Sequence, residues 1–378
     1  MLNCLASPKS AYIHVPFCRH RCGYCDFTLV AKRDDLIEAY LDAIAVEMSS
    51  LQHPRAVDTI FIGGGTPTHL SPQQLDQFLK LVRQWFEPSP NCEFSSEANP
   101  LDLTDERLQI LAENGVNRIS LGIQSFNDVA LEVLERDHRV AELGEINERV
   151  RRYFDNVSFD LIFGVPGQSR QQWQDSLEAA IRLQPNHIST YGLTFEKGTA
   201  FWTRKDRGEL LPVHESLEAD MYDDAIRLLD AAGIKQYEIS NFAADGFECR
   251  HNEVYWRGLP YFAFGPGAAS YVDGYRRTNH RSVTTWLKRI QEGESPVDVE
   301  EQLTPEERAR EAIVIGLRRN QGIDRNEFQA LTGFDLEQLI GTEIQRAIKN
   351  GNLRDDDRAV SLTSQGRLLY DSVIVDFL

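Results

Sequence analysis

The sequence has little of what marks a membrane-spanning, exported or nucleic-acid-binding protein. No apolar run among its 378 residues approaches the roughly 20 residues that a transmembrane helix needs. The opening segment "MLNCLASPKS" has no apolar core of signal-peptide length. There is no basic block, and a formal charge of −18 disfavours nonspecific binding of nucleic acid. We therefore expect a cytoplasmic protein.

Cysteine is also scarce, and the six cysteines are too few for a disulfide framework in a chain of this length. Three of them, Cys18, Cys22 and Cys25, lie together in "HVPFCRHRCGYCDF", and no fourth follows closely. Three thiolates can hold a [4Fe–4S] cluster by three of its irons and leave the fourth iron open. The spacing leaves zinc as an alternative, with His14 or His20 as a fourth ligand.

The first half of the chain alternates short β-rich runs with amphipathic helical patterns, which is typical of βα units around a parallel sheet. Asp34 and Ser71 are the expected N-caps of two of these helices. Six units fit either an open doubly wound sheet or a partial barrel. The predicted strands are "AYIHV", "DTIFI", "CEFSSE", "NRISLGI", "NVSFDLIFG" and "HISTYGL".

Polar and glycine-rich residues follow one predicted strand after another. "GGGTP", with Gly63 to Gly65, comes after the second strand, and Glu97, Gln124 and Asp160 lie at or near the ends of the next three. Because ligands bind at the carboxyl ends of the strands in both architectures, we expect these residues to share one site.

The pattern changes from about residue 210. We expect a helix over "ESLEADMYDDAIRLLDAAG", a strand over "QYEIS", and then a breaker-rich connection, "EGESPVDVEEQLTPEE". The tail reads as three helices and a hairpin, "DDDRAVSLT", which is a winged-helix-like pattern. Residues 301–378 carry ten Lys and Arg against fourteen Asp and Glu, a net charge of −4, so we expect a packing or docking module rather than a DNA-binding one. The predicted domains are a core barrel over 1–210, an α/β extension over 211–295 and a small helical domain over 300–378.

The Cys-x3-Cys-x2-Cys array after a first strand resembles the signature of radical S-adenosylmethionine (SAM) enzymes. This resemblance implies an α/β fold with a partial (β/α)6 barrel. It also implies a [4Fe–4S] cluster on Cys18, Cys22 and Cys25, with SAM on the open iron. In that family the reduced cluster cleaves SAM to a 5′-deoxyadenosyl radical, so the cofactor carries the difficult chemistry.

Motifs along nearly the whole chain narrow the resemblance to the oxygen-independent coproporphyrinogen III oxidase family. They are "YIHVPFCRHRCGYCDF", "FIGGGTPT", "EANP", "RISLGIQSF", "DLIFGVPGQ" and "LTSQGRLLYDSVI". The resemblance implies SAM contacts at Tyr12, Tyr24, Gly64, Gly65, Thr66, Glu97, Gln124, Arg136, Asp160, Thr194 and Ala269.

Two departures separate the chain from the oxidase itself. Phe27 stands where the oxidase has a cysteine two residues beyond the third cluster ligand, and only 17 residues precede Cys18. Both features match a shorter branch of the family, the radical SAM haem chaperones. "HNEVYW", from His251 to Trp256, resembles a haem-binding motif of that branch, so His251 is the predicted haem ligand. Cys249, like Cys4 and Cys92, is interpreted as a packed thiol.

The resemblance therefore implies a haem chaperone that passes haem to acceptor haemoproteins, membrane respiratory enzymes among them. It is compatible with a homodimer and with peripheral association at the inner face of the membrane. Two alternatives stay open. One is oxidative decarboxylation of coproporphyrinogen III to protoporphyrinogen IX, and the other is a zinc-stabilised interaction protein with a winged-helix module.

Overall fold

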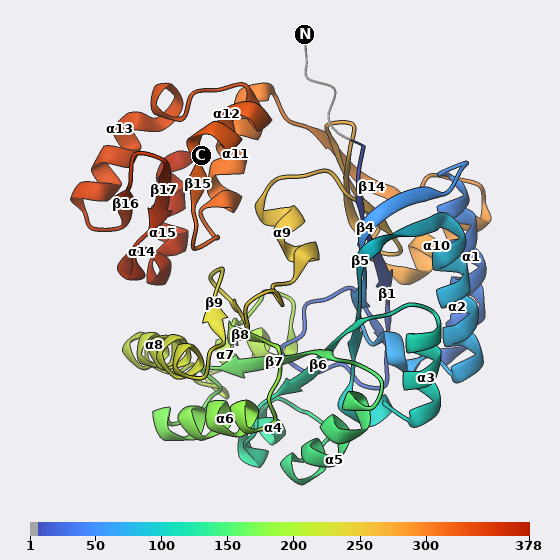
Figure 1. Ribbon diagram of the computed structural model, residues 1–378. Helices are drawn as coiled ribbons and strands as arrows, with labels where there is room; N and C mark the ends of the chain where they lie inside the picture. The colour runs from blue at the N-terminus through green and yellow to red at the C-terminus, as the bar shows by residue number, and fades with distance from the viewer. Residues whose placement is uncertain (1–6) are drawn as a thin grey trace.

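The central element is a nine-stranded sheet, in a computed structural model that describes residues 7–378. Its middle six strands are parallel and follow one another in chain order. They curve into an arc with helices on the outside (Figure 1), which confirms the predicted partial (β/α)6 barrel and all six strands. The six are β1 (Ser10–Val15), β4 (Arg55–Gly64), β5 (Phe86–Ala98), β6 (Arg118–Gln124), β7 (Asn156–Phe163) and β8 (His187–Gly192).

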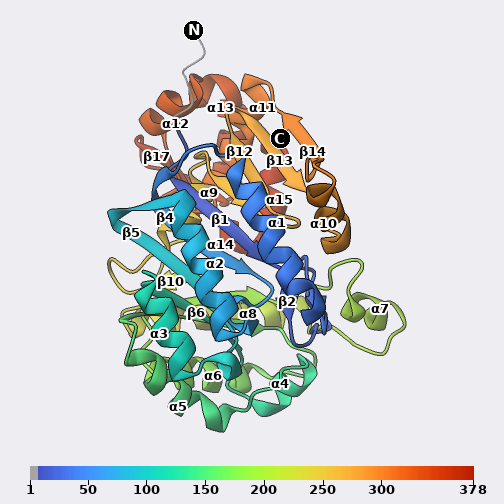
Figure 2. The same ribbon diagram turned by 90° about the vertical axis from the view of Figure 1, so that its right-hand side faces the viewer.

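Helices cover the convex face of this arc, and Figure 2 shows the first three side by side over β1, β4 and β5. The main apolar core lies between these helices and the sheet and includes Ile60, Phe94 and Phe159. These helices are α1 (Ile37–Ser49), α2 (Pro72–Trp85), α3 (Asp105–Glu113), α5 (Val140–Arg151), α6 (Arg170–Arg182) and α8 (Glu215–Ala231). The short helices α4 (Asp128–Val133) and α7 (Ala200–Asp206) contribute instead to a smaller apolar cluster.

Of the two expected N-caps, one is confirmed and one is wrong. The Ser71 hydroxyl accepts a hydrogen bond from the Gln74 amide and forms a capping box at the start of α2. Asp34 instead opens a short 3₁₀ turn (Asp34–Leu36) before α1, and its carboxylate lies 2.9 Å from His69 Nε2. That extra turn moves the start of α1 to Ile37, beyond the reach of the Asp34 side chain.

The residues after α8 extend the sheet at both ends. β10 (Asn241–Ala243) pairs antiparallel with β8 and with β9 (Lys235–Gln236), whereas β11 (Phe262–Phe264) adds a parallel strand beside β1. The predicted strand "QYEIS" is wrong beyond Gln236, because the chain turns there so that the Tyr237 amide can donate to the Asn241 carbonyl.

The expected breaker-rich connection also contains a strand, β14 (Val297–Gln302). It pairs with β13 (Tyr275–Asn279), which pairs in turn with β12 (Ala269–Val272). In the sequence, α10 (Val283–Gln291) connects β13 to β14. Exposed side chains dominate β14, so nothing in its local pattern indicates a strand, and the pairing with β13 decides its conformation.

The C-terminal residues pack around a separate apolar core that includes Ile313, Phe328 and Ile344. Three helices and a small antiparallel sheet confirm the predicted winged-helix-like pattern, with two more short helices at the end. The elements are α11 (Pro305–Gly316), β15 (Ile323–Asp324), α12 (Arg325–Thr332), α13 (Leu336–Lys349), β16 (Leu353–Asp355), β17 (Ala359–Leu362), α14 (Ser364–Leu368) and α15 (Tyr370–Ile374). The domain boundaries near residues 210 and 300 stay predictions.

A short helix, α9 (Arg250–Trp256), lies inside the arc between the barrel strands and the C-terminal domain (Figure 1). It carries the "HNEVYW" motif. Among residues 7–378, no helix combines the length and the apolar character needed to cross a membrane.

Candidate functional site

A cavity of about 1510 Å³ runs through the barrel interior and opens beside the C-terminal domain. The three clustered cysteines, the residues at the strand ends and the α9 motif all line it. Ordinary small-molecule pockets measure roughly 300–1,000 Å³. The cavity is therefore large enough for more than one small ligand.

The cysteine loop is anchored at both ends by a short parallel pairing of β2 (Phe17–Cys18) with β3 (Val30–Ala31). The Cys25 amide donates to the Cys22 carbonyl, which makes a tight turn between these two ligands. Burial raises the pKa of the Cys18 thiol to about 12, with the nearby Thr66 hydroxyl opposing that rise. Without a metal this thiol stays protonated, so the loop needs bound cations to hold it as a thiolate.

The surroundings of the sulfurs suit an iron–sulfur cluster. The Cys18 sulfur lies 3.2 Å from the Thr66 hydroxyl, and the Arg136 guanidinium lies 3.7 Å from the Cys22 sulfur. Within residues 7–378 there is no group of three or more His, Cys, Asp or Glu side chains spaced for a single metal ion.

His14, a possible zinc ligand by sequence, is committed elsewhere. Its Nε2–H donates to the Thr28 carbonyl at 2.6 Å, and its Nδ1 accepts from the Tyr12 hydroxyl at 2.9 Å. Burial lowers the pKa of His14 to about 4, so the ring is neutral. His14 therefore ties the cysteine loop to β1 and fixes the Tyr12 side chain.

The glycine loop, Gly63 to Gly65 at the end of β4, packs directly against this histidine. Gly64 has a φ of +109°, and a Cβ at this position would overlap the His14 ring. The Gly64 amide donates to the Glu97 carboxylate at 3.0 Å, and a Cβ on Gly65 would approach the Phe17 carbonyl to 2.7 Å. Glycine is needed here because the loop touches both the cysteine segment and the next strand.

Two half-buried carboxyl groups, Glu97 and Asp160, face the cavity from β5 and β7. Burial, reinforced by the charge of Asp160, raises the pKa of Glu97 to about 8. Burial also raises the pKa of Asp160, which accepts a hydrogen bond from the Ser120 hydroxyl. Both groups are positioned to accept hydrogen bonds from hydroxyl or ammonium groups of a bound molecule.

Arg136 and Gln124 complete the end of the cavity nearest the cysteines. The Arg136 guanidinium donates to the Gly122 carbonyl at 2.7 Å, and its Nε has no partner among the described residues. Gln124 has a φ of +68° at a point where β6 and β7 slip register. Strained backbone of this kind is common at ligand sites.

Of the other predicted SAM contacts, Tyr12, Tyr24, Thr66 and Thr194 also line the cavity, whereas Ala269 does not. Tyr24 packs edge-on against Phe201. Ala269 lies in β12 outside the cavity wall, so the structure brings together ten of the eleven predicted residues. The residues brought together are Tyr12, Tyr24, Gly64, Gly65, Thr66, Glu97, Gln124, Arg136, Asp160 and Thr194.

His251, the predicted haem ligand, is buried, and both of its ring nitrogens are occupied. Nδ1 lies 2.8 Å from the Thr59 hydroxyl, and Nε2 lies 2.8 Å from the Tyr255 hydroxyl. The ring stacks on Phe61, and burial lowers its pKa to about 3. Iron ligation by His251 therefore requires the Tyr255 hydroxyl to move away from Nε2.

The α9 motif is fixed at its N-terminus by Glu93. The Glu93 carboxylate accepts hydrogen bonds from the Arg250 and His251 amides, each at 3.0 Å. The Cys249 sulfur lies 3.6 Å from the same carboxylate and is fully buried, as expected for a packed thiol. Cys92 is buried as well, and Cys4 lies outside the described residues.

The other end of α9 contacts the C-terminal domain. The Arg318 guanidinium lies 4.5 Å from the Trp256 ring, and Arg319 forms an ion pair with Glu253 at 3.1 Å. The motif thus joins the barrel interior to the C-terminal domain.

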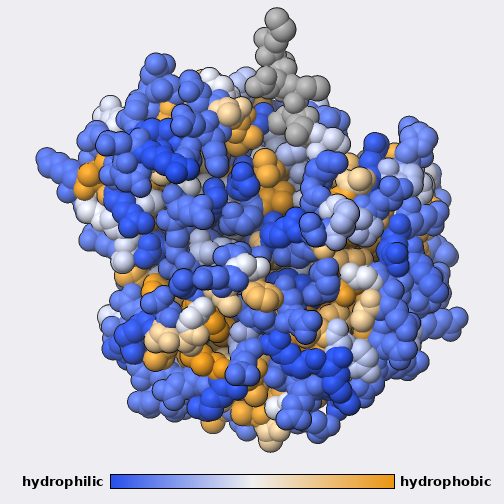
Figure 3. All heavy atoms as spheres, in the orientation of Figure 1, coloured by the Kyte–Doolittle hydropathy of each residue, from blue (hydrophilic) through white to orange (hydrophobic). Residues whose placement is uncertain are grey.

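Sequence reasoning missed the contribution of the C-terminal domain to the cavity wall. Arg367, Leu368 and Leu369 in and after α14 line the cavity, and the two leucines are 42% and 44% exposed. Tyr191 at the end of β8 also lines it and is 43% exposed. Figure 3 shows apolar side chains gathered beside α8 on an otherwise mainly hydrophilic face. No local pattern marks these leucines, because only the packing of two domains brings them to the barrel mouth.

Family models match two parts of the chain. A model of the radical SAM superfamily matches residues 12–180, and a model of the HemN C-terminal domain matches residues 303–369.

Two curated relatives match over nearly the whole length. The chain is 40% identical to the haem chaperone HemW of Bacillus subtilis, covering 98% of this chain and 99% of that protein. It is 36% identical to the haem chaperone HemW of Lactococcus lactis, covering 99% of this chain and 98% of that protein. Among solved structures, the coproporphyrinogen III oxidase HemN of Escherichia coli superposes with a TM-score of 0.85 at 22% identity, covering 98% of this chain and 90% of that one. The last likeness shows the fold alone.

Proposed function

Since the chain belongs to the radical SAM superfamily and, within it, to the family of the HemW proteins, we propose that it is a haem chaperone that delivers haem to acceptor haemoproteins. Membership of the superfamily implies a [4Fe–4S] cluster and SAM. The observation that carries the proposal is the cavity, which extends from the cysteine loop to a mouth with exposed apolar side chains under the C-terminal domain.

Cys18, Cys22 and Cys25 hold the cluster in this proposal. The bound cluster and SAM supply one-electron chemistry. The chain's own residues orient SAM: Glu97 and Asp160 accept hydrogen bonds from its hydroxyl or ammonium groups, and the Arg136 guanidinium faces its carboxylate beside the Cys22 sulfur.

Haem occupies the wider part of the cavity. A porphyrin has two apolar faces and two carboxylates, and the cavity mouth offers matching groups. Tyr191, Leu368 and Leu369 supply apolar surface, and Arg367 supplies a guanidinium group, whereas Arg318 is already paired with Glu238 at 3.4 Å. His251 is the proposed iron ligand, once the Tyr255 hydroxyl has moved from Nε2. The same proposal includes membrane respiratory enzymes among the acceptors. It also includes a cytoplasmic homodimer that contacts the membrane peripherally.

Haem titration of the anaerobically reconstituted protein tests the proposal, with a parallel assay of coproporphyrinogen III under reducing conditions with SAM. The chaperone assignment predicts a saturable haem spectrum at one haem per chain and no protoporphyrinogen. Formation of protoporphyrinogen with stoichiometric 5′-deoxyadenosine would make the protein an oxidase instead. Absence of a saturable haem spectrum would also refute the assignment.

A further inference from the structure

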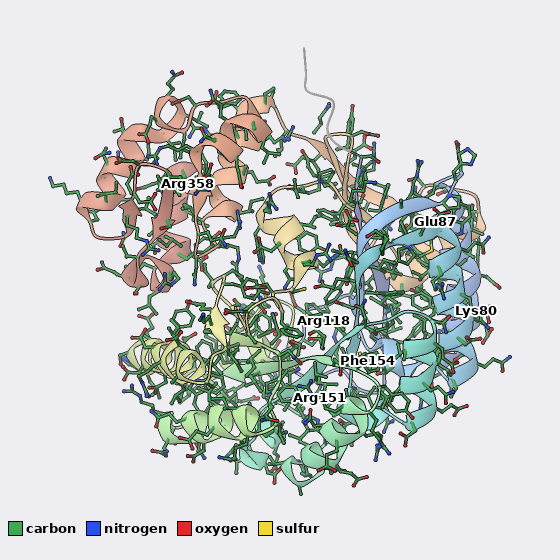
Figure 4. All side chains as sticks on the ribbon, in the orientation of Figure 1. Lys80, Glu87, Arg118, Arg151, Phe154 and Arg358 are labelled. Carbon is green, nitrogen blue, oxygen red and sulfur yellow. The ribbon has the colours of Figure 1, made fainter. Side chains whose placement is uncertain are left out.

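Arg118, at the first position of β6, is a buried cation that faces the cavity. Its side chain is only 2% exposed, and it lies near the middle of the molecule (Figure 4). Arg118, Ser120, Gly122 and Gln124 alternate along β6 and all line the cavity. Arg118 is the member of this row furthest from the carboxyl end of the strand, and therefore furthest from the cysteines.

The Arg118 guanidinium has no protein partner. Within residues 7–378 it forms neither an ion pair nor a hydrogen bond, and its Nε is completely buried. Ser95 and Asn156 are its register neighbours on β5 and β7, and each has an oxygen that also lacks a partner. The guanidinium therefore does not turn toward the oxygens on the strands beside it.

The nearest carboxyl groups do not neutralise this cation by contact. Glu93 accepts from the amides at the start of α9, Asp160 from the Ser120 hydroxyl, and Glu97 from the Gly64 amide. Arginine stays charged in proteins. Burial lowers the pKa of Arg118, but the nearby charges of Glu93 and Asp160 help to raise it above its usual value. What the described residues leave open is a hydrogen-bond acceptor for its N–H groups, and a ligand carboxylate supplies one.

We propose that Arg118 binds a carboxylate of the second small molecule in the cavity, which, on the proposed function, is a haem propionate. The SAM carboxylate has another candidate cation, nearer the cysteines. Gln124 at the cysteine end of β6 lies six residues from Arg118, which is about 20 Å along a strand. Arg136, 3.7 Å from the Cys22 sulfur, is the cation placed for the SAM carboxylate. A planar guanidinium and a carboxylate form two parallel hydrogen bonds, which gives such a site strength and orientation.

The test compares haem with haem dimethyl ester, whose propionates carry no charge, on the cluster-loaded full-length protein. The wild type should bind haem more tightly than the ester. Arg118→Met should weaken haem binding by about 10- to 100-fold, as expected for a charge-assisted pair, and should leave ester binding unchanged. Arg118→Lys should retain part of the preference for haem. The exposed Arg182, 68% accessible on α6, provides the matched control Arg182→Met, which should change nothing.

Two further readouts separate this role from a structural one. Because Arg118 forms no hydrogen bond or ion pair with the described residues, Arg118→Met should melt close to the temperature of the wild type, and its SAM affinity should be unchanged. A lower melting temperature with equal loss of haem and ester binding would overturn the proposal, as would loss of SAM affinity. If the wild type binds haem and its ester equally, the Arg118 subsite alone fails. If the wild type binds neither, the proposed function fails and the subsite with it.

Discussion

Replacing Gly64 with alanine tests whether the glycine loop supports the cysteine loop through His14. Two costs add at this position. A residue other than glycine at a φ of +109° costs about 1–3 kcal/mol, and overpacking against the His14 ring costs about 1–3 kcal/mol more. If the ring moves to make room, it gives up its hydrogen bonds to Thr28 and Tyr12. The variant should therefore lose at least about 2 kcal/mol of stability and should reconstitute with less iron.

Thermal unfolding and the iron and sulfide content after anaerobic reconstitution measure both effects. Gly144→Ala is the matched control. Apart from the adjoining backbone of α5, no atom of the described residues lies within 4 Å of a Cβ at Gly144, and alanine favours a helix by up to about 1 kcal/mol. A Gly64→Ala protein with wild-type melting temperature and full iron content would refute the inferred contact between the two loops.

Three further perturbations test other parts of the account. Tyr255→Phe removes the hydroxyl at Nε2 of His251, so haem should bind more tightly if His251 is the iron ligand; unchanged affinity and an unchanged haem spectrum would contradict that ligation. Burial raises the pKa of Glu47 to about 7, so the folded protein favours the protonated carboxyl group. This preference stabilises the fold fully below about pH 4.5, and the stabilisation is lost as the pH rises through 7. The 2.5-unit rise corresponds to about 3 kcal/mol, and the wild type should lose about this much relative to Glu47→Gln between pH 4 and 8 in chemical denaturation; parallel pH profiles would show that Glu47 is not perturbed. Cys22→Ser should abolish the cluster, whereas the buried control Cys92→Ser should keep it; equal sulfide content and charge-transfer absorbance in the two variants would contradict the cluster assignment.

The sequence was sufficient for the barrel because its signals are local. Alternating βα patterns predicted all six parallel strands, and Ser71 has the Gln74 partner that makes its capping box. β14 escaped prediction because its conformation depends on pairing with β13, and its own residues are mostly exposed and polar. Asp34 looked like a cap, but a 3₁₀ turn precedes the helix it was expected to start.

Some residues of the candidate site could likewise be predicted from the sequence, and others could not. The strand-end residues Glu97, Gln124 and Asp160 could be predicted to converge, because parallel strands end at one edge. The hydrogen bonds of the two His251 ring nitrogens could not be predicted, because Thr59 and Tyr255 approach the ring from different elements. Arg118 gave no signal either, because an arginine at the start of a strand is ordinary until its burial and lack of a partner are known.

Transfer of haem tests the chaperone assignment most directly. The protein, loaded with its cluster and one equivalent of haem, is mixed with an apo-haemoprotein, and the two are separated and their haem spectra recorded over time. The account predicts that haem leaves the chain and appears in the acceptor with the acceptor's own spectrum. A chain that keeps its haem while the acceptor stays empty, or that never binds haem in a saturable way, would contradict it.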